Sequence, residues 1–589
     1  MFSLRHPAAL VLVVCLAQAQ PPVDKHHSVR EKAAPDTLTD THTARLPGAA
    51  GAPAKPHNWV DEKLFGAAAK AGVAMAPLCS DVEFLRRASL DLTGRLPEPE
   101  RIRKFAADTD PLKRDKLIDE ILHTSTKGVI RRPTTPFLDK WAYFFADLYR
   151  LNPIMSRGQR LFYNHIYNAL LVNQPYDEFV REILTATTRS NHFSAPANFF
   201  VRSYIDEPDQ STVNHEDSYD EFALSSTKLF LGINLECVSC HDGKGHLENV
   251  NSWLAGRKRA DLWRHAAFFT KMRMYRPYGD LWDEFVINNE GKGTYDVRHK
   301  SVVRPMRYQA ELTPTFLLTG EHPAPGEDHR AAFARMTTGH IQFSRAIVNV
   351  IWAELFGTGL VDPPLDFNLD RYEGHRAELL DALAKDFQTH GYDLRYLIRL
   401  LATSSAYQLS HRYGAEWKPE YSAFFARRMI RRLGAPEIWD AISEATGVYE
   451  DLPQGDPAVK VKYVMQTVSV ADLPQKLHRA LASFGYDDRT FGTKNLSSSI
   501  VQSSVLMNNE LVKAKLKADA KGRIRALLTA EPPKTNAQIA EELFLSALSR
   551  FPTTEELEYG AQLLAAQHER GAEDLLWTLL NKAEFVLHY

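Results

Sequence analysis

Residues 219–233 read YDEFALSSTKLFLGI and place apolar side chains three and four positions apart. This spacing gathers them on one face of an α-helix, where they can face a core. The same period recurs along most of the chain, for example in FLDKWAYFFADLYRL at residues 137–151. Strand-like alternation is scarce, and VKYVMQTVSV at residues 461–470 is its clearest case. The pattern predicts a mainly α fold: two irregular helical domains with long loops and little β-structure.

Length and charge narrow the class of protein. A chain of 589 residues is long enough for more than one domain, and its composition, 44% hydrophobic and 24% charged, is that of a soluble globular protein. The formal net charge is only -2, so the chain as a whole has no field that would attract nucleic acid. After the amino-terminal region, no stretch offers eighteen uninterrupted apolar residues, so we expect no transmembrane segment in the mature chain.

The amino terminus has the layout of a secretory signal peptide over residues 1–19. A short basic region at Arg5 precedes an apolar run of about ten residues, too short to cross a bilayer, and small residues lead to a cleavage site after Ala19. An uncleaved anchor is the alternative. Cys15 follows two valines, where a lipoprotein signal has small residues, so a lipid anchor is not favoured. We expect an exported protein, periplasmic or at the cell surface or outside the cell.

Composition also suggests the domain boundaries. Residues 20–56 are rich in Pro, Ala, His and Thr without an apolar period, which predicts a disordered linker. Helical patterning begins at residue 57, and a loop-rich, proline-containing stretch interrupts it at residues 291–326. We therefore expect an N-terminal helical domain at residues 57–290 and a C-terminal helical domain at residues 327–589.

One motif carries recognisable chemistry, the sequence Cys237-Val238-Ser239-Cys240-His241. C-x-x-C-H is the pattern of covalent haem attachment, in which two thioether bonds hold the haem edge and the adjacent imidazole reaches the iron. The motif follows a predicted helix and precedes a polar, glycine-containing loop, and export suits this chemistry. The pattern indicates haem c attached at Cys237 and Cys240, with His241 as axial ligand.

The sixth iron ligand is less determined by the sequence. The candidates are Met272, Met274, His246 and His265, and an open sixth position is a further alternative. Methionine on an amphipathic helix is also an ordinary core residue, so packing is the competing interpretation for Met272.

Other interpretations of the same residues stay open. Cys237 and Cys240 could hold zinc together with two of His241, His246 and His265, although there is no second C-x-x-C. They could also form a redox disulfide, or stay unmodified thiols that brace a turn. A phosphate-binding P-loop, a G-x-S-x-G elbow and an H-E-x-x-H motif are all missing, so the sequence does not decide whether the protein is an enzyme.

An arginine-rich stretch, FFARRMIRRLGAPE, is predicted to be helical. Arg427-Arg428 and Arg431-Arg432 recur there at i, i+4 spacing. The arginines could bind an anion, but pairing with carboxylates on a helix face is the commoner explanation.

Several long segments resemble a known family. Residues 84–105, 140–150 and 230–242 are similar to the first of two domains of unknown function, 1549 and 1553, which occur together in exported, cytochrome-associated proteins of Planctomycetes and related bacteria. Similarity to the second domain is found at residues 345–367, 379–410, 498–512, 547–560 and 579–589. The resemblance implies no established activity.

The chain departs from the family pattern beside the motif. Family members often continue it as C-H-D-H-P-F with a tryptophan nearby, whereas here Asp242-Gly243-Lys244-Gly245-His246 follows, and Trp253 comes later. The second histidine is thus displaced by three positions, which places in doubt any ligand role carried over to His246.

Taken together, these features predict a c-type-cytochrome-like protein that transfers electrons in the cell envelope. Its expected partners are redox or envelope proteins, and nucleic acid is not among them. The alternative is a non-redox binding or structural module with zinc or bracing thiols at the same residues. The sequence does not determine the oligomeric state.

Overall fold

The computed structural model describes residues 35–48, 51–123, 135–209, 212–277, 284–454, 459–469, 472–486, 489 and 500–589. The predicted signal peptide at residues 1–19 lies outside the described residues, as does the linker up to residue 34. Helix makes up 55% of the structure and strand 4%, so the prediction of a mainly α fold is confirmed. Among the described residues, no helix is both long and apolar enough to span a membrane.

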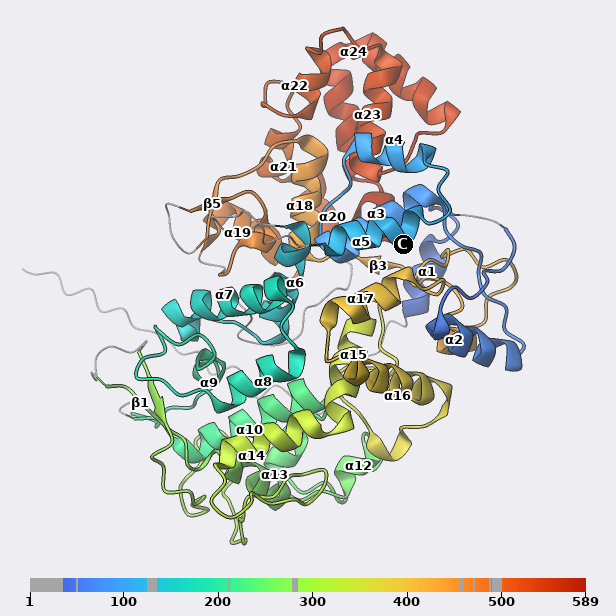
Figure 1. Cartoon of the computed structure of the whole chain (residues 1–589). Coiled ribbons are helices and arrows are strands. Elements are labelled where there is room, and N and C mark those ends of the chain that lie inside the picture. Colours follow the sequence, from blue (N-terminus) through green and yellow to red (C-terminus); the bar gives the residue numbers. More distant parts are fainter. Residues whose placement is uncertain are drawn as a thin grey trace, which may run out of the picture.

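The helices before residue 291 are short to medium in length (Figure 1). They are α1 (Pro35–His42), α2 (Trp59–Lys70), α3 (Asp81–Thr93), α4 (Pro99–Ala107), α5 (Lys113–Leu122), α6 (Pro136–Leu148), η1 (Pro153–Met155), α7 (Arg157–Val172), α8 (Tyr176–Thr185), α9 (Asn198–Val201), α10 (His215–Leu231), α11 (Glu236–Cys240), α12 (Ser252–Ala255), α13 (Arg259–Ala266) and η2 (Ala267–Phe269).

The helices after residue 326 include the longest one, α24, which contains a kink at His568. They are α14 (His329–Gly339), α15 (Ile341–Phe356), η3 (Leu369–Arg371), α16 (Gly374–Thr389), α17 (Leu394–Thr403), η4 (Pro419–Phe424), α18 (Ala435–Thr446), η5 (Val464–Gln466), α19 (Gln475–Ala482), α20 (Ile500–Asn508), α21 (Glu510–Lys515), α22 (Arg523–Leu528), α23 (Asn536–Leu548), α24 (Thr554–Leu580) and α25 (Ala583–Val586).

The strands form three small antiparallel pairs in the described part of the chain. The first pairs β1 (Arg273–Tyr275) with β2 (Val286–Asn288), with Met274 opposite Ile287. The second pairs β3 (Arg431–Arg432) with β6 (Leu587–His588), and the third pairs β4 (Leu452–Pro453) with β5 (Lys460–Val461). Strand-like alternation at residues 461–470 therefore mostly does not become strand, because η5 occupies its centre.

The stretch at residues 219–233 forms most of α10, as its period predicts. Asn214 caps the helix by accepting a hydrogen bond from the Asp217 amide at 3.1 Å. Gly232 ends it in the left-handed conformation, with φ of 65°. A side chain at Gly232 would also lie 2.7 Å from the ring of Phe367, so glycine is needed there for two reasons. The exact end of α10 matters because it sets where the C-x-x-C-H motif begins.

Two large hydrophobic cores hold the helices together, and each combines residues from both sides of residues 291–326. The first core includes Trp141 and Trp263 together with Trp352. The second is built mainly after residue 430, around Trp439, but it takes Leu90 from α3. Figure 1 shows the same mixing, since α4 lies against α23 near the end of the chain. The domain boundaries drawn from composition stay predictions.

Part of the predicted linker is folded, which corrects the expectation of disorder for residues 35–48. This segment contains α1, and Leu46 is buried against Ile430, Leu587 and Tyr589. The Thr39 hydroxyl also accepts a hydrogen bond from the Ile430 amide at 3.0 Å. The segment has too few buried apolar residues to show a helical period in its sequence. It is held instead by contacts with Ile430 and with the distant carboxyl terminus.

The arginine stretch at residues 427–432 is not helical, so that prediction is wrong. Arg431 and Arg432 form β3, which pairs with the end of the chain. The expectation of carboxylate partners is confirmed, because Arg428 and Arg431 both pair with Asp91, at 3.2 and 3.0 Å. A partner strand more than 150 residues away overrides the helical spacing.

Candidate functional site

The C-x-x-C-H motif forms the short helix α11 and the turn that follows it. Cys237 and Cys240 lie three residues apart in α11, so both thiols are on the same side of one helical turn. Cys237 is exposed and Cys240 half-buried, whereas Cys79 is buried. All three are free thiols, so no disulfide joins Cys237 to Cys240 in this structure. The pair is accessible for covalent attachment or for metal binding.

The environment of Cys237 does not make it a nucleophile. Although Cys237 is exposed, partial desolvation by its neighbours raises the pKa of its thiol, and the carboxylates of Glu236 and Asp366 raise it further. The thiol is therefore protonated at neutral pH, whereas nucleophilic and redox cysteines have a lowered pKa. This argues against the redox-disulfide interpretation.

One ring nitrogen of His241 makes a hydrogen bond, and the other is available for ligation. Its Nδ1 lies 2.9 Å from the backbone carbonyl oxygen of Asp242. A carbonyl can only accept, so Nδ1 carries the proton and Nε2 has its lone pair free. A hydrogen bond from the far ring nitrogen to a carbonyl is the arrangement that orients metal-binding histidines. His241 is thus prepared to ligate through Nε2.

The loop after His241 is packed tightly against α12. The Gly243 amide donates to the carbonyl of Arg257 at 2.8 Å, and a side chain at Gly243 would overlap the carbonyl oxygen of Leu254. Glycine is therefore required for this close approach. The loop then returns through Gly245, whose φ is +85° and whose amide donates to Glu248 at 2.6 Å.

Arg259, at the start of α13, fastens the motif to a distant segment. Its Nε donates to the carbonyl of Ser239, between the two cysteines, at 3.2 Å. Its two terminal nitrogens donate to the carbonyls of Met306 and Pro305, at 2.9 and 2.7 Å. From the same segment, the Tyr308 hydroxyl donates to Asp242 at 3.2 Å. We call residues 304–308 the strap.

Sequence reasoning missed Arg259 and the strap. The strap lies in the stretch predicted to be a connection between domains, and Arg259 looked like one charge on an amphipathic helix. Local pattern offers no signal for a guanidinium that binds three carbonyls from two segments. The high proline content around Pro305 indicated a loop but not its destination.

Of the four candidate sixth ligands, the structure brings only His246 to the motif. The ring centre of His246 lies 4.6 Å from that of His241, with 50° between the planes. His246 is exposed, while His241 is half-buried. The displacement of this histidine by three positions therefore does not remove it from the site.

Met272 and Met274 lie at the other end of α10, and both are buried. The Tyr219 hydroxyl, in the first turns of α10, donates to the carbonyl of Met272 at 2.7 Å. The motif comes after the last turn, and the twelve residue steps from Tyr219 to Leu231 span about 18 Å of helix. Figure 1 agrees, with β1, which contains Met274, far from α12. Core packing is the role that the contacts of these two methionines support.

His265 is also a core residue. It is fully buried, and its ring lies 5.1 to 6.2 Å from the rings of Phe268, Phe316 and Phe333. Its Nδ1 accepts a hydrogen bond from the Leu317 amide at 3.2 Å. Burial lowers the pKa of His265 to about 4, so the ring is neutral at neutral pH. The structure does not bring it to the cysteines.

Within the described residues, no group of three or more His, Cys, Asp and Glu side chains is arranged to hold a metal ion. The zinc alternative would therefore need His241, His246 and the two thiols to converge further than they do here. Two imidazoles 4.6 Å apart are its strongest support.

A groove lies along α12 and α13. Trp253, Arg257, Arg264, Phe316 and His340 contribute to its walls, and its volume is about 470 Å³. The guanidinium of Arg257 stacks over Trp253 at 4.1 Å. The groove therefore offers aromatic and cationic surface next to the loop that carries His246.

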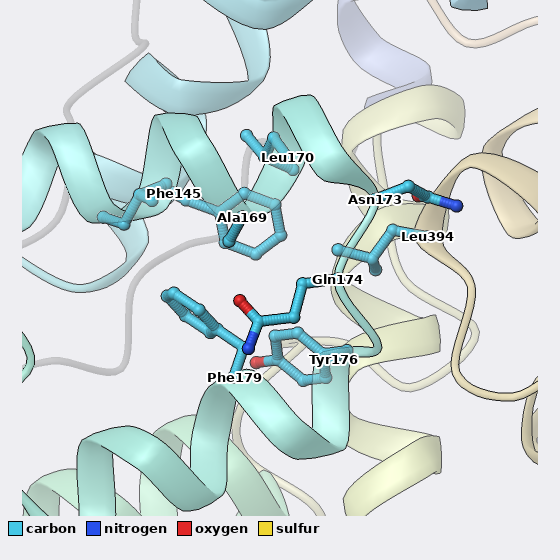
Figure 2. Close-up of a pocket in the computed structure, with 9 residues that line it drawn as sticks. Phe145, Ala169, Leu170, Asn173, Gln174, Tyr176, Phe179 and Leu394 are labelled. Atoms are coloured by element: carbon cyan, nitrogen blue, oxygen red, sulfur yellow. The ribbon is translucent and has the colours of Figure 1, made fainter.

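A second pocket, away from the motif in sequence, lies between α7, α8 and the start of α17 (Figure 2). Its walls are mostly apolar, with Phe145, Tyr176, Phe179 and Leu394, and Gln174 reaches across it (Figure 2). The Gln174 amide nitrogen donates to Glu182 at 2.8 Å. None of its lining residues belongs to the C-x-x-C-H motif, and we assign it no role in the site.

Comparison with protein families places two known domains on this chain. A family model described as Protein of unknown function (DUF1549), PSCyt2, matches residues 59–273, which include the C-x-x-C-H motif. A second, described as Protein of unknown function (DUF1553), PSD1, matches residues 329–564. The resemblance inferred from the sequence is thereby confirmed. No curated protein and no solved structure matches the chain.

Proposed function

Because this chain belongs to the proteins that carry a PSCyt2 domain followed by a PSD1 domain, we propose that it is a c-type-cytochrome-like protein. Haem is attached covalently at Cys237 and Cys240, with His241 as its axial ligand. The protein passes electrons to redox or envelope partners. The family name PSCyt2 suggests an association with cytochromes, which supports this proposal.

The state of His241 is the observation that carries the proposal. Its Nδ1 is held by the Asp242 carbonyl at 2.9 Å, so Nε2 presents a lone pair beside two free, accessible thiols. An oriented imidazole directly after two thiols three residues apart is what covalent attachment and axial ligation require together. The raised pKa of the Cys237 thiol keeps that thiol protonated until an attachment apparatus modifies it.

The remaining groups hold the site in shape. Arg259 ties the carbonyl between the two cysteines to the strap, and Gly243 keeps the loop against α12. When bound, the haem supplies one-electron redox chemistry, and its axial ligands and exposure set the potential. The protein's part is to orient Nε2 of His241.

Location and partners follow from the same proposal. The signal-peptide pattern of residues 1–19 supports export to the periplasm or the cell surface, where covalent haem attachment takes place in bacteria. An electron carrier there works with redox or envelope proteins. The second domain would then serve as a surface for docking such a partner.

A zinc site is the second candidate, a non-redox binding or structural role. The observation that favours it is the approach of His241 and His246 to 4.6 Å, because a shared ion could hold both imidazoles together with the two thiols. Here the site would brace the turn between α11 and α12.

Expression of the full chain with haem-attachment machinery tests the proposal. We expect a Soret band, reduced α bands and haem-stained protein after denaturation. Cys237→Ser and Cys240→Ser should each reduce the stain, whereas Cys79→Ser, which changes a buried thiol elsewhere, should not. Purified protein without covalent haem but with one equivalent of zinc would overturn the haem proposal in favour of the second candidate.

A further inference from the structure

The strap at residues 304–308 is anchored at every position except the side chain of Met306. Arg304 pairs with Glu221, and Arg307 pairs with Asp217 and Asp220 at 2.6 and 3.0 Å. The Met306 side chain, by contrast, is 86% exposed. A rigid segment thus presents one free thioether to solvent.

This thioether is attached close to the motif. The guanidinium of Arg259 binds the carbonyls of Ser239 and Met306 at the same time. Two acceptors that share one guanidinium lie within about 8 to 9 Å of each other, the sum of two hydrogen bonds and the width of the group. Methionine has three rotatable bonds, so its sulfur can sweep several ångströms from the backbone. The backbone of Met306 is therefore held near Ser239, the residue before Cys240, and its unanchored side chain is free to turn toward the motif.

A second link fixes the strap to the residue after the axial ligand. The Tyr308 hydroxyl donates to Asp242 at 3.2 Å, and the ring of Tyr308 packs edge-on against Trp263 at 4.8 Å. The backbone of Asp242 in turn holds Nδ1 of His241. The strap and the imidazole are thus positioned by the same carboxyl-bearing residue, which keeps their separation constant.

The competing residues are less suitable in this geometry. Imidazoles on opposite faces of one iron, with metal–nitrogen bonds of about 2 Å, have ring centres roughly 6 Å apart. His241 and His246 are at 4.6 Å, so the two rings would have to move apart before both could ligate one iron from opposite faces. Met272 and Met274 lie at the far end of α10.

We propose that Met306 would supply the sixth ligand to the iron of an attached haem. This inference rests on the proposed function, since it needs the haem to be attached. A thioether ligand raises the reduction potential relative to a second imidazole, so the site would be a carrier of relatively high potential.

The test uses the full chain with attached haem and the variant Met306→Leu. In the wild type we expect the weak near-infrared absorption of a thioether bound to ferric iron, and slow binding of carbon monoxide to the ferrous form. Met306→Leu should lose this absorption, bind carbon monoxide rapidly and show a lower midpoint potential. Met507→Leu, at another partly exposed methionine, is the matched control and should match the wild type.

The outcomes separate the two proposals. Wild-type protein without haem stain overturns the proposed function and this inference with it. Stained protein whose absorption and potential are unchanged in Met306→Leu overturns this inference alone. Wild-type protein that lacks the thioether absorption, and whose ferrous form binds carbon monoxide rapidly in His246→Asn but not in Met306→Leu, would assign the sixth ligand to His246. Because Met306 is exposed, unchanged thermal unfolding should show that its variant folds.

Discussion

Two regions of the molecule concentrate polar chemistry, and they differ in accessibility. The first is the C-x-x-C-H turn, where Cys237 is exposed and His241 has a free nitrogen lone pair. The second, which we call the Asp91 network, consists of Asp91, Tyr407, Arg428, Arg431 and His588. Asp91 is 0% exposed, and each partner comes from the C-terminal part of the chain.

The Asp91 network has the larger pKa shifts but no open side. Burial lowers the pKa of Arg428 to about 10, and burial with four nearby arginines lowers the pKa of His588 far below its ordinary value. Strongly shifted groups often mark active sites. Here they mark the packing of α3 against the end of the chain. The candidate site is recognised instead by atoms that are available for ligation or covalent attachment, namely the Cys237 sulfur and Nε2 of His241. In this protein, exposure to solvent therefore distinguishes the candidate site from a buried polar network better than a shifted pKa does.

The largest expected effect is in the Asp91 network. Asp91→Ala leaves Arg428 buried without its carboxylate and removes the acceptor of the Tyr407 hydroxyl, so unfolding should become easier by about 3–5 kcal/mol. Urea denaturation measures this difference. The control is Asp119→Ala, which breaks an exposed pair with Arg399 and should cost at most about 1 kcal/mol. Equal effects of the two substitutions would contradict the contrast between buried and exposed polar groups.

The second effect concerns pH and the buried His265. Its folded-state pKa is about 4, below the ordinary value of 6.5 because of burial. The unfolded chain binds this proton first, so the group favours folding fully above pH 6.5 and loses that contribution as the pH falls to about 4. The contribution of His265 to this loss is about 3 kcal/mol. Stability curves of His265→Leu should fall less steeply over this window, and those of His246→Asn, at an exposed ring, should follow the wild type.

The third effect tests the packing of the motif's loop. Gly243→Ala places a methyl group against the Leu254 carbonyl, so the loop must shift, at a cost of about 1–3 kcal/mol. Thermal unfolding and the yield of haem-stained protein should both decrease. Gly256→Ala is the matched control, since its added carbon would meet only the Trp253 carbonyl at 3.5 Å, an ordinary contact. Loss of yield in the control but not in Gly243→Ala would show that this close approach is not needed.

The smallest effect on stability, and a direct measure of accessibility, is expected at the thiols. Cys237→Ser should change the free energy of unfolding by less than about 0.5 kcal/mol, because the side chain is exposed. In protein produced without haem attachment, Ellman's reagent should modify Cys237 in the folded state. Cys79 is 3% exposed and burial raises the pKa of its thiol to about 11, so it should react only in denaturant. Rapid modification of Cys79 in native protein would remove its value as a control.

Much of the local structure could be predicted from the sequence. The helical period of residues 219–233 identified α10. In α3, the Ser80 hydroxyl caps the helix by accepting from the Glu83 amide at 3.3 Å, and the Glu83 carboxylate also pairs with Arg87. That pairing involves a buried guanidinium that binds the carbonyls of Tyr407 and Leu409. Predictions from local sequence patterns are thus correct except where a residue distant in sequence offers a competing contact.

The candidate site was predictable in part for the same reason. Cys237, Cys240 and His241 are contiguous in sequence, so their pattern by itself identified them and the chemistry that they suggest. Distance along the chain suggested Met272 and Met274 as neighbours, yet α10 separates them from the motif. Met306, by contrast, is more than sixty residues away, and Arg259 brings it near.

By itself, the sequence determined the helical class, the two family domains and the three contiguous residues of the motif, because period and short spacing act within one or two turns of the backbone. Only the tertiary structure decided that both cores combine both halves of the chain, that the arginines at 428 and 431 serve Asp91, and that the strap lies against the motif. Those contacts join residues far apart in sequence, and their energy depends on burial and shared hydrogen bonds that exist only after the chain has folded.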